Sequence, residues 1–390
     1  MINSDLYISL MKLNEICEVY SGYAIKEFNN IRKGLPVIKI GNILTDGTLN
    51  LGECQFSTED INEKYHSKKG DIYVALSGAT TGKLGIMEDE KKYIINQRVG
   101  IIRLKQKSVS QSYIKFFLLK QTERIIDEAT GCAQPNISPK QIGEYDVPVF
   151  PEKEMLQISD ILNNIVCVIK HYKAMIKKYD DLIKARFIEM FGRPFINNLN
   201  WESKQIKNVV NEVKYGTSKP SVENGEYKYL RMNNLTYDGR FDLTDLKFIS
   251  LDNDELEKCV VRKGDVLFNR TNSLDLIGKT AEFDFNEDMV IAGYIIRIRL
   301  KEAIVPKFFS MYMNTDEMKL HLRTIAKGAV NQANINAQEL QEIPIYLPPI
   351  ELQNQFVNFV RHVDKSREEV KKSLEKTQQL YDSLMQEYFG

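Results

Sequence analysis

The stretch Ile38-Lys39-Ile40-Gly41-Asn42-Ile43-Leu44-Thr45-Asp46-Gly47 returns later in the chain as Leu230-Arg231-Met232-Asn233-Asn234-Leu235-Thr236-Tyr237-Asp238-Gly239. In the same order, Lys69-Gly70-Asp71-Ile72 returns as Lys263-Gly264-Asp265-Val266. The copies are 192 residues apart in the first pair and 194 in the second. Because similarity at a steady spacing indicates a repeat, the sequence predicts one unit of roughly 190 residues in tandem.

Both copies share an internal plan. A first part has short apolar runs, such as residues 72–76 and 99–104, and contains Asp-Gly and Gly-Asp turns, a pattern typical of strands in an α+β fold. A proline-marked exit then leads into a segment without proline or glycine, at residues 152–191 in the first copy and 350–389 in the second. The sequence therefore predicts a tandem duplication of a mixed α+β part followed by a long helix.

Apolar residues in the first long segment alternate by three and four, which is the spacing of a coiled-coil seam. We expect the two helices to pair antiparallel about a pseudo-twofold axis, with about 39 residues giving a strut of roughly 58 Å. The alternative is that both helices belong to a larger helical core. The predicted seam comprises Ile158, Ile161, Ile165, Val168, Tyr172, Met175, Tyr179 and Leu182 in the first helix, and Phe356, Phe359, Val363, Val370, Leu374, Thr377, Leu380 and Leu384 in the second, where Arg367 interrupts it.

Composition describes an ordinary globular protein. The chain has 390 residues, 43% of them hydrophobic, with 53 basic and 53 acidic side chains. Two or three domains fit this length, and disorder and collagen are excluded. A net charge of zero argues against a protein that coats DNA non-specifically, although local basic faces or basic partners remain possible.

Location and metal content follow from what the sequence lacks. No apolar stretch approaches the roughly 18 residues of a membrane span, and the first residues lack the basic region of a signal peptide. The five cysteines are scattered and form no C-x-x-C pair, and the four histidines are isolated from one another. We expect a cytoplasmic protein without a disulfide framework, a zinc site or a membrane contact.

One segment looks like a phosphate-binding loop. Residues 77–84 read Ser-Gly-Ala-Thr-Thr-Gly-Lys-Leu, but Ser77 stands where the P-loop needs glycine, and Leu84 stands where it needs a hydroxyl for Mg²⁺. The second copy, residues 273–280, also lacks the first glycine. ATP binding is therefore not expected, whereas a turn that offers N–H groups and Lys83 or Lys279 to a DNA phosphate is.

Catalytic motifs are mostly missing. Methyl transfer to a base needs an Asn/Asp-Pro-Pro-Tyr/Phe or Pro-Cys motif and a glycine-rich loop, and none is present. Asp71 with residues 90–92 matches a metal-dependent nuclease by letter alone, and the second copy does not repeat it. We expect a chain without catalytic or metal-ligating residues.

Polar loops remain as candidates for base recognition. The loop at residues 131–138 recurs at residues 328–336, and both contain asparagine and glutamine. Amides pair with adenine and arginine with guanine, but amides also close turns, so this loop either contacts bases or fixes the joint between mixed part and helix. The DNA-binding candidates are Lys39, Asn42, Ser77, Thr80, Thr81, Lys83, Gln97, Arg98, Gln134, Asn136, Arg231, Asn233, Asn234, Arg270, Thr271, Asn272, Lys279, Tyr294, Asn331, Gln332 and Asn334, with residues 270–272 the favoured run.

Together these features resemble the specificity subunit of type I restriction-modification systems. The resemblance covers residues 11–390 and rests on two alternating pairs of recognition domain and long helix, on the Lys-Gly-Asp strand entries, on the Gly-x-x-x-Gln/Asn-x-Asn-Ile loops, and on the proline-rich helix entries followed by Gln157-Ile158 and Gln355-Phe356. It implies target-recognition domains at residues 1–150 and 201–348, a helix and linker at 151–200, and a second helix at 349–390.

The resemblance also implies the function and the partners. A non-catalytic subunit would read two halves of an asymmetric, bipartite double-stranded DNA site, while the antiparallel helices set the spacer and dock two methyltransferase subunits. Restriction subunits with translocase and nuclease activity would complete the enzyme, and S-adenosylmethionine, ATP and Mg²⁺ would bind only to partner subunits. The alternatives are a coiled-coil adaptor that does not read DNA and a stand-alone nucleotide-binding enzyme.

Overall fold

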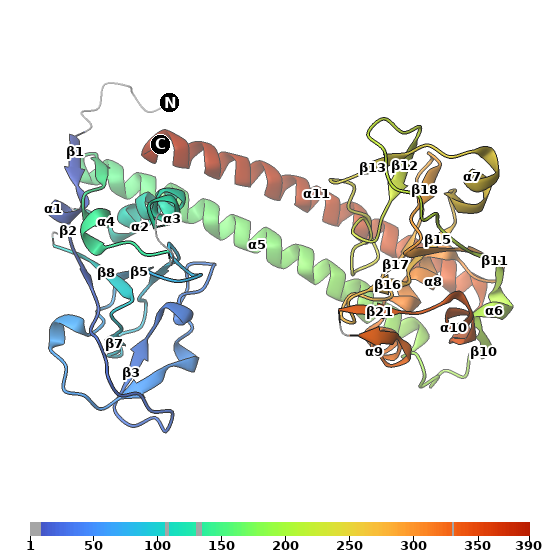
Figure 1. The fold of residues 1–390 in the computed structure, drawn as a ribbon, viewed down its shortest axis with the longest axis horizontal. Helices are drawn as coiled ribbons and strands as arrows, with labels where there is room; N and C mark the ends of the chain where they lie inside the picture. Colours follow the sequence, from blue (N-terminus) through green and yellow to red (C-terminus); the bar gives the residue numbers. More distant parts are fainter. Residues whose placement is uncertain (1–8, 106–108, 130–134, 330) are drawn as a thin grey trace. The chain divides into compact units, whose positions relative to one another are not determined.

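The computed structural model describes residues 9–105, 109–129, 135–329 and 331–390, and its contacts divide the chain into two compact units. Unit 1 comprises residues 1–173 and 372–390, and unit 2 comprises residues 174–371. Each unit contains mixed strands and short helices together with parts of two long helices, α5 (Glu152–Phe191) and α11 (Ile350–Phe389). The α+β class and both long helices are therefore confirmed (Figure 1).

The described residues of unit 1 form two antiparallel sheets and one mixed sheet. In Figure 1, α2, α3 and α4 lie beside the first turns of α5. Its sheets have the strand orders β2-β8-β5-β6, β4-β3-β7 and β1-β9. The elements are β1 (Ser9–Lys12), α1 (Leu13–Ile16), β2 (Cys17–Ser21), β3 (Leu35–Ile38), β4 (Gln55–Ser57), β5 (Ile72–Ala75), β6 (Leu84–Ile86), β7 (Ile94–Ile95), β8 (Val99–Leu104), α2 (Gln111–Lys120), α3 (Thr122–Ala129), α4 (Pro139–Gly143) and β9 (Asp146–Val149), with 3-10 turns at Ile40–Asn42, Leu51–Glu53 and Glu63–Tyr65.

Unit 2 repeats this plan. Its sheets have the orders β11-β19-β15-β17, β13-β12-β18-β14 and β10-β22, and a small sheet β16-β21-β20 is added. Figure 1 shows β12, β13 and β18 with α7 at one end of the unit and α9 and α10 at the other. The elements are β10 (Glu202–Gln205), α6 (Ile206–Val209), β11 (Val210–Tyr215), β12 (Tyr227–Leu230), β13 (Lys247–Ile249), α7 (Asn253–Cys259), β14 (Val260–Val261), β15 (Val266–Asn269), β16 (Thr271–Asn272), β17 (Thr280–Glu282), β18 (Met289–Ile291), β19 (Ile295–Leu300), α8 (Pro306–Met313), α9 (Asp316–Ile325), β20 (Lys327–Ala329), β21 (Gln332–Asn334), α10 (Ala337–Glu342) and β22 (Pro344–Leu347).

The Lys-Gly-Asp motif fixes the entry to the central strand in both units. Gly70 has a φ of 97°, which favours glycine, and the Asp71 carboxylate accepts a hydrogen bond of 2.8 Å from the backbone N–H of Lys68. Asp71 is also buried against Arg103, with N–O distances of 2.7 and 2.6 Å. Such a charge-assisted, two-point pair compensates the burial of the carboxylate.

Unit 2 keeps the same arrangement. The Asp265 carboxylate accepts 2.9 Å from the backbone N–H of Arg262 and pairs with Arg299 at 3.0 Å. The duplication seen in the sequence is therefore repeated in the contacts that hold the sheet.

The long helices run antiparallel within unit 2. Phe187 of α5 packs on Phe356 of α11 with ring centroids 5.4 Å apart, and Asp180, two turns earlier in α5, pairs at 3.1 Å with Arg367, three turns later in α11. Arg367 is therefore a polar member of the helix contact.

The domain boundaries predicted from the sequence differ from the division into two compact units, since each unit contains part of each long helix. The boundaries stay a prediction.

The seam on α5 differs from the predicted one at alternate positions. Ile161, Val168, Met175 and Leu182 are 41, 39, 39 and 46% exposed, whereas their neighbours in sequence, Leu162, Ile169, Ile176 and Ile183, are buried or half-buried. Each exposed residue and its buried or half-buried neighbour are both apolar, so either of them satisfies the three-and-four spacing of a coiled-coil seam. The remaining predicted seam residues, Ile158, Ile165, Tyr172, Tyr179, Phe356, Phe359, Val363, Val370, Leu374, Thr377 and Leu384, are buried or half-buried, and Leu380 is exposed.

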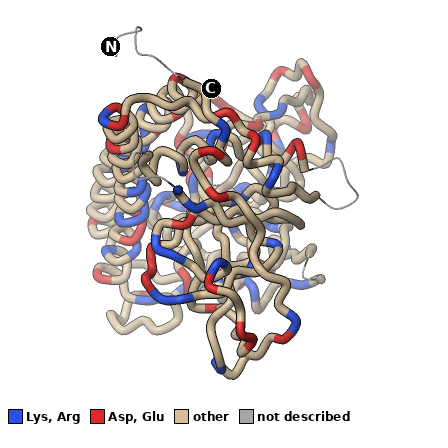
Figure 2. Tube along the Cα trace, turned by 90° about the vertical axis from the view of Figure 1, so that its left-hand side faces the viewer, with Lys and Arg blue, Asp and Glu red and all other residues tan. Residues whose placement is uncertain are grey.

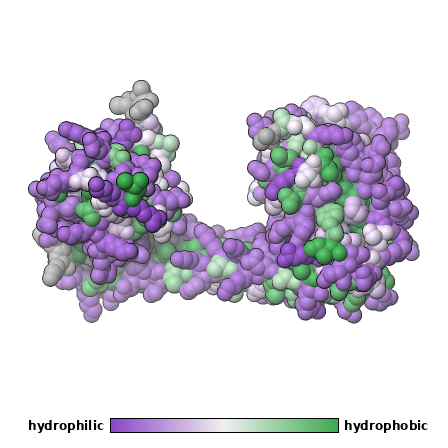
Figure 3. Space-filling model, turned by 90° about the horizontal axis from the view of Figure 1, so that it is seen from below, coloured by the Kyte–Doolittle hydropathy of each residue, from purple (hydrophilic) through white to green (hydrophobic). Residues whose placement is uncertain are grey.

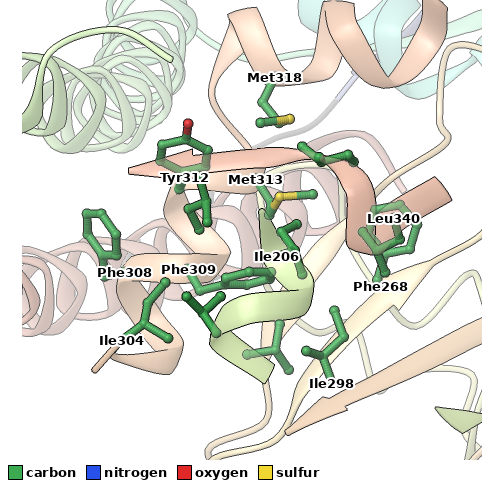
Figure 4. Close-up of a cluster of buried hydrophobic side chains, with 14 of the residues drawn as sticks. Ile206, Phe268, Ile298, Ile304, Phe308, Phe309, Tyr312, Met313, Met318 and Leu340 are labelled. Carbon is green, nitrogen blue, oxygen red and sulfur yellow. The ribbon is translucent and has the colours of Figure 1, made fainter. Parts of the chain in front are cut away.

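Each helix end completes a core made mostly by the other repeat. In unit 2, Phe191 of α5 contacts Phe308 of α8 at 4.8 Å between centroids. In unit 1, Phe389 of α11 contacts Tyr113 of α2 at 5.0 Å. Figure 4 shows part of the unit 2 core, where Phe308, Phe309, Tyr312 and Met313 of α8 gather with Ile206, Phe268, Ile298, Ile304, Met318 and Leu340.

We predict that Phe389→Ala destabilises unit 1 although its contacts there lie far away in sequence. Phe389 is 6% exposed, and removing a buried phenyl ring costs about 3 kcal/mol of unfolding free energy. Denaturant unfolding measures the loss, and amide hydrogen exchange should accelerate in α2. Leu380→Ala, at a position 51% exposed, is the control and should change stability by less than about 0.5 kcal/mol. Faster exchange confined to unit 2 would contradict this assignment.

Candidate nucleic-acid interface

The predicted DNA-binding residues gather mainly at one end of the central sheet in each unit. In unit 1 the backbone of Leu76, directly after β5, donates 2.9 Å to the carbonyl of Arg98 and accepts 2.9 Å from Ile137. In unit 2 the backbone of Arg270 donates 2.9 Å to Tyr294 and accepts 2.9 Å from Ile335. In each unit, the same backbone bonds thus join three separate loops at one end of the central sheet. We call this region the loop end of the unit: it lies around Leu76, Arg98 and Ile137 in unit 1 and around Arg270, Tyr294 and Ile335 in unit 2.

Backbone pairing continues along the loop end of unit 2. Thr271 pairs with Asn334 and Asn272 with Ala333 in the small sheet, and the Thr271 hydroxyl donates 3.3 Å to the Asn334 amide oxygen. The favoured run at residues 270–272 and the amide loop therefore form one surface. In unit 1 the corresponding bridge joins Ser77 to Asn136.

Several candidates are exposed at these loop ends. They are Gln97, Arg98 and Asn136 in unit 1 and Tyr294, Asn331 and Gln332 in unit 2, where Tyr294 is 51% exposed. Asn334 and Asn272 are half-buried, and the Asn272 amide donates 2.8 Å to Asn269. Gln134 lies outside the described residues. Base contact by any of them stays a prediction.

Two candidate asparagines close turns instead. The Asn42 amide oxygen accepts 2.9 Å from the backbone N–H of Lys39, and its amide nitrogen donates 3.0 Å to the carbonyl of Asn50. Asn234 repeats both bonds, at 2.9 Å each, with Arg231 and Asp242. Both side chains are buried and have their partners inside the turn, which is the turn-closing role of an amide, and contact of Asn42 or Asn234 with DNA stays a prediction.

The neighbouring cations are partly engaged. Lys39 lies 3.5 Å over the ring centroid of Phe28 and bonds Gln55, and burial lowers the pKa of its ammonium. Arg231 pairs with Asp245 at 2.7 Å, and the exposed Asn233 lies 3.4 Å from the same carboxylate. A phosphate would have to compete with these partners.

The loop that resembles a phosphate-binding loop is a tight turn in unit 1. The Thr81 hydroxyl donates 2.6 Å to the carbonyl of Gly78, and Gly78 and Gly82 have φ values of 83° and 84°. The hydroxyls of Ser77 and Thr80 are buried with no hydrogen-bond partner among the described residues. Lys83 is half-buried.

In unit 2 the corresponding lysine points inward. Lys279 is 8% exposed, its ammonium donates 3.2 Å to the carbonyl of Met232, and burial lowers its pKa. Lys319 donates 2.7 Å to the carbonyl of Gly278 and is 3% exposed. Burial, followed by repulsion from Lys279 and Arg323, lowers the pKa of Lys319 to about 7. The Lys279 ammonium therefore faces the interior of unit 2, and its contact with a DNA phosphate stays a prediction.

Sequence reasoning missed Tyr215. It ends β11, the residue is 43% exposed, and the Arg270 guanidinium carbon lies 4.8 Å from the ring centroid. A comparison of the two repeats could have found it, because the equivalent last residue of β2 is Ser21, so the repeats differ at this position.

The surface carries mixed charge. In unit 1, which faces the viewer in Figure 2, Lys and Arg alternate with Asp and Glu along the loops. Figure 3 shows hydrophobic residues gathered on the face of unit 2 that it presents, and exposed apolar side chains of this unit include Phe195, Ile196 and Leu320. Within the described ranges, no helix is long and apolar enough to cross a membrane, and no three His, Cys, Asp or Glu side chains are grouped to hold a metal ion.

A family model for the type I restriction modification DNA specificity domain matches residues 8–178 and again residues 198–379. The chain belongs to this family. It carries two tandem specificity domains, so the family and the role of specificity subunit expected from the sequence are confirmed. Unit 1 contains the loop end of the first specificity domain and unit 2 that of the second.

Relatives that match over most of this chain and most of their own length support the assignment. The EcoBI specificity subunit of Escherichia coli is 22% identical, covering 97% of this chain and 85% of the relative. The EcoKI specificity subunit of Escherichia coli K12 is 20% identical, covering 91% and 82%. The crystal structure of a type I S subunit from M. genitalium is 16% identical, covers 100% of this chain and 98% of that one, and has a TM-score of 0.59, which supports the fold of this type I specificity chain.

We predict that Asn234→Ala lowers the unfolding free energy of the chain by about 1 to 2 kcal/mol, because it leaves buried backbone groups of the turn without partners. Denaturant unfolding measures this loss. Asn331→Ala, at an exposed position, is the matched control and should change stability by less than about 0.5 kcal/mol. Equal stability of both variants would show that the turn does not depend on the amide.

Lys319 should make stability depend on pH. Its pKa is about 7 when folded against an ordinary 10.5, so between these values the unfolded chain binds a proton there that the folded chain lacks. Stability should therefore rise with pH across this window, by up to about 1 kcal/mol per pH unit, and be independent of this group below it. Denaturant unfolding from pH 6 to 9 should show a flatter slope in Lys319→Met but not in the exposed control Lys258→Met. An unchanged slope in Lys319→Met would contradict the assignment.

Proposed function

We propose that this specificity subunit reads the two halves of a bipartite, asymmetric double-stranded DNA site, one with each specificity domain. The observation that carries the proposal is the pair of loop ends, where the same backbone bonds hold different side chains. Unit 1 has buried Leu76 and exposed Arg98 at positions where unit 2 has Arg270 and Tyr294. Since base recognition depends on side-chain donors and acceptors, different residues in one frame favour different half-sites.

The chain would act without catalytic residues of its own. Methylation would belong to two methyltransferase subunits, and cleavage to restriction subunits with translocase and nuclease activity. S-adenosylmethionine, ATP and Mg²⁺ would bind to those partners and not to this chain. A net charge of zero supports a division in which the partners supply much of the attraction to phosphate.

The long helices would set the unread spacer and carry the methyltransferase subunits. Exposed aliphatic residues support this role: Ile161 and Val168 on α5 in unit 1, and Met175 and Leu182 in unit 2. Apolar side chains that recur every seven residues on a solvent-facing side of a helix suit a helical partner.

A genome-wide methylation map of the source cell, with and without this gene, tests the proposal. We expect one bipartite motif with a fixed spacer to lose its adenine methylation when the gene is removed. Restoring the gene on a plasmid should restore the motif, and the control is that the methyltransferase gene of the system is expressed in both strains. If no motif changes, the DNA-reading proposal fails, and a coiled-coil adaptor that bridges proteins becomes the better account.

A further inference from the structure

The two loop ends differ most where β11 and β15 end in unit 2. Tyr215 pairs with Ile296 in the central sheet as Ser21 pairs with Gly100 in unit 1. Arg270 follows β15 as Leu76 follows β5, with the same backbone bonds. Unit 2 thus has a tyrosine and an arginine where unit 1 has a serine and a buried leucine. The side chains differ, whereas the backbone hydrogen bonds are the same.

The Arg270 guanidinium is held in a defined position. Its central carbon lies 4.8 Å from the centroid of the Tyr215 ring, within the range of a cation–π contact, and Nη1 donates 3.4 Å to the carbonyl of Gly293. Its Nε is buried without a hydrogen-bond partner among the described residues.

The Tyr215 side chain is held by the start of α10. Its hydroxyl accepts 2.8 Å from the backbone N–H of Ala337, the first residue of α10. The side chain of Asn336 caps the next two N–H groups, at 2.9 Å each, so the hydroxyl completes the helix start. The ring is therefore held in place, and Tyr215 as a residue remains 43% exposed.

Among the described residues Arg270 has no acidic partner, whereas several other arginines of unit 2 do. Arg231 pairs with Asp245 at 2.7 Å, Arg240 with Asp180 at 2.9 Å, and Arg299 with Asp265 at 3.0 Å. No salt bridge of the described residues includes Arg270. A guanidinium that is oriented by a ring and a carbonyl, and not neutralised by a carboxylate, keeps N–H groups for an external acceptor.

Guanine is the base that suits such a group. Its O6 and N7 lie side by side in the major groove, and arginine contacts both with two parallel N–H groups. The flat ring beneath the guanidinium reduces the rotamer freedom that would be lost on binding. Adenine offers N7 but replaces O6 with a donor, so it would face the same guanidinium with one repulsive contact.

We propose that Arg270 reads a guanine in the half-site of the second specificity domain and that Tyr215 is the residue that positions it. The inference rests on the proposed function and adds a base and two residues to it. The first domain has Ser21 and Leu76 at these positions, and its exposed Arg98 lies in the turn before β8.

The test uses the chain assembled with its methyltransferase subunits and duplexes that carry the mapped motif. Each guanine of both half-sites is replaced in turn by 7-deazaguanine, which keeps Watson–Crick pairing but lacks the N7 acceptor. We expect one position at which the substitution weakens binding by the wild-type complex roughly tenfold. Arg270→Ala should bind the normal and substituted duplexes equally well at that position and keep the wild-type response at all others.

Tyr215 variants separate positioning from folding. Tyr215→Ser introduces the residue of unit 1 and should reduce the tenfold discrimination to less than about threefold, with binding to unrelated DNA unchanged. Tyr215→Phe keeps the ring and should keep most of the discrimination. Arg98→Ala is the matched control and should leave the response at this guanine intact. Thermal unfolding of each variant identifies any that fail to fold.

Two results would overturn the inference. One is an Arg270→Ala complex that keeps the wild-type response at every guanine, and the other is a motif without guanine in the half-site of the second domain. A wild-type complex that binds no mapped duplex better than unrelated DNA would instead overturn the proposed function, so the two failures are distinguishable.

Discussion

The burial of the two long helices at both of their ends is the constraint on which the structure depends. Phe187 and Phe191 of α5 lie in the core of unit 2, whereas Tyr388 and Phe389 of α11 lie in the core of unit 1. The C-terminal end of each long helix thus packs in the core of the unit that the other repeat mainly builds. Neither unit has a complete core without residues from both repeats, and the antiparallel pairing within unit 2 follows from that exchange.

Within this frame, structural and variable positions are separate. The Asp71–Arg103 and Asp265–Arg299 pairs hold the central sheets, and the buried amides of Asn42 and Asn234 hold equivalent turns. The loop ends receive the same backbone bonds but differ in side chains. A family domain that must present different surfaces on one fold can vary such positions without changing the turns and ion pairs that support them.

The sequence predicted some features well because they depend on strong local signals. Both long helices begin and end as expected, since proline and glycine mark their limits. The seam of α5 was predicted correctly only at alternate positions, because apolar neighbours such as Ile161 and Leu162 cannot be separated by spacing. The inward turn of Lys279 and the support of Arg270 by Tyr215 depend on contacts between distant segments, which a linear pattern does not contain.

The exchange of helix ends also bears on the order in which the chain can fold during synthesis. Domains usually fold as they leave the ribosome, beginning with the N-terminal one. Here the first part of the chain to be made needs Tyr388 and Phe389 to close its core. Its apolar surface around α2 therefore stays open while the whole second repeat is translated, and that interval is when the nascent chain is most exposed to chaperones and to aggregation.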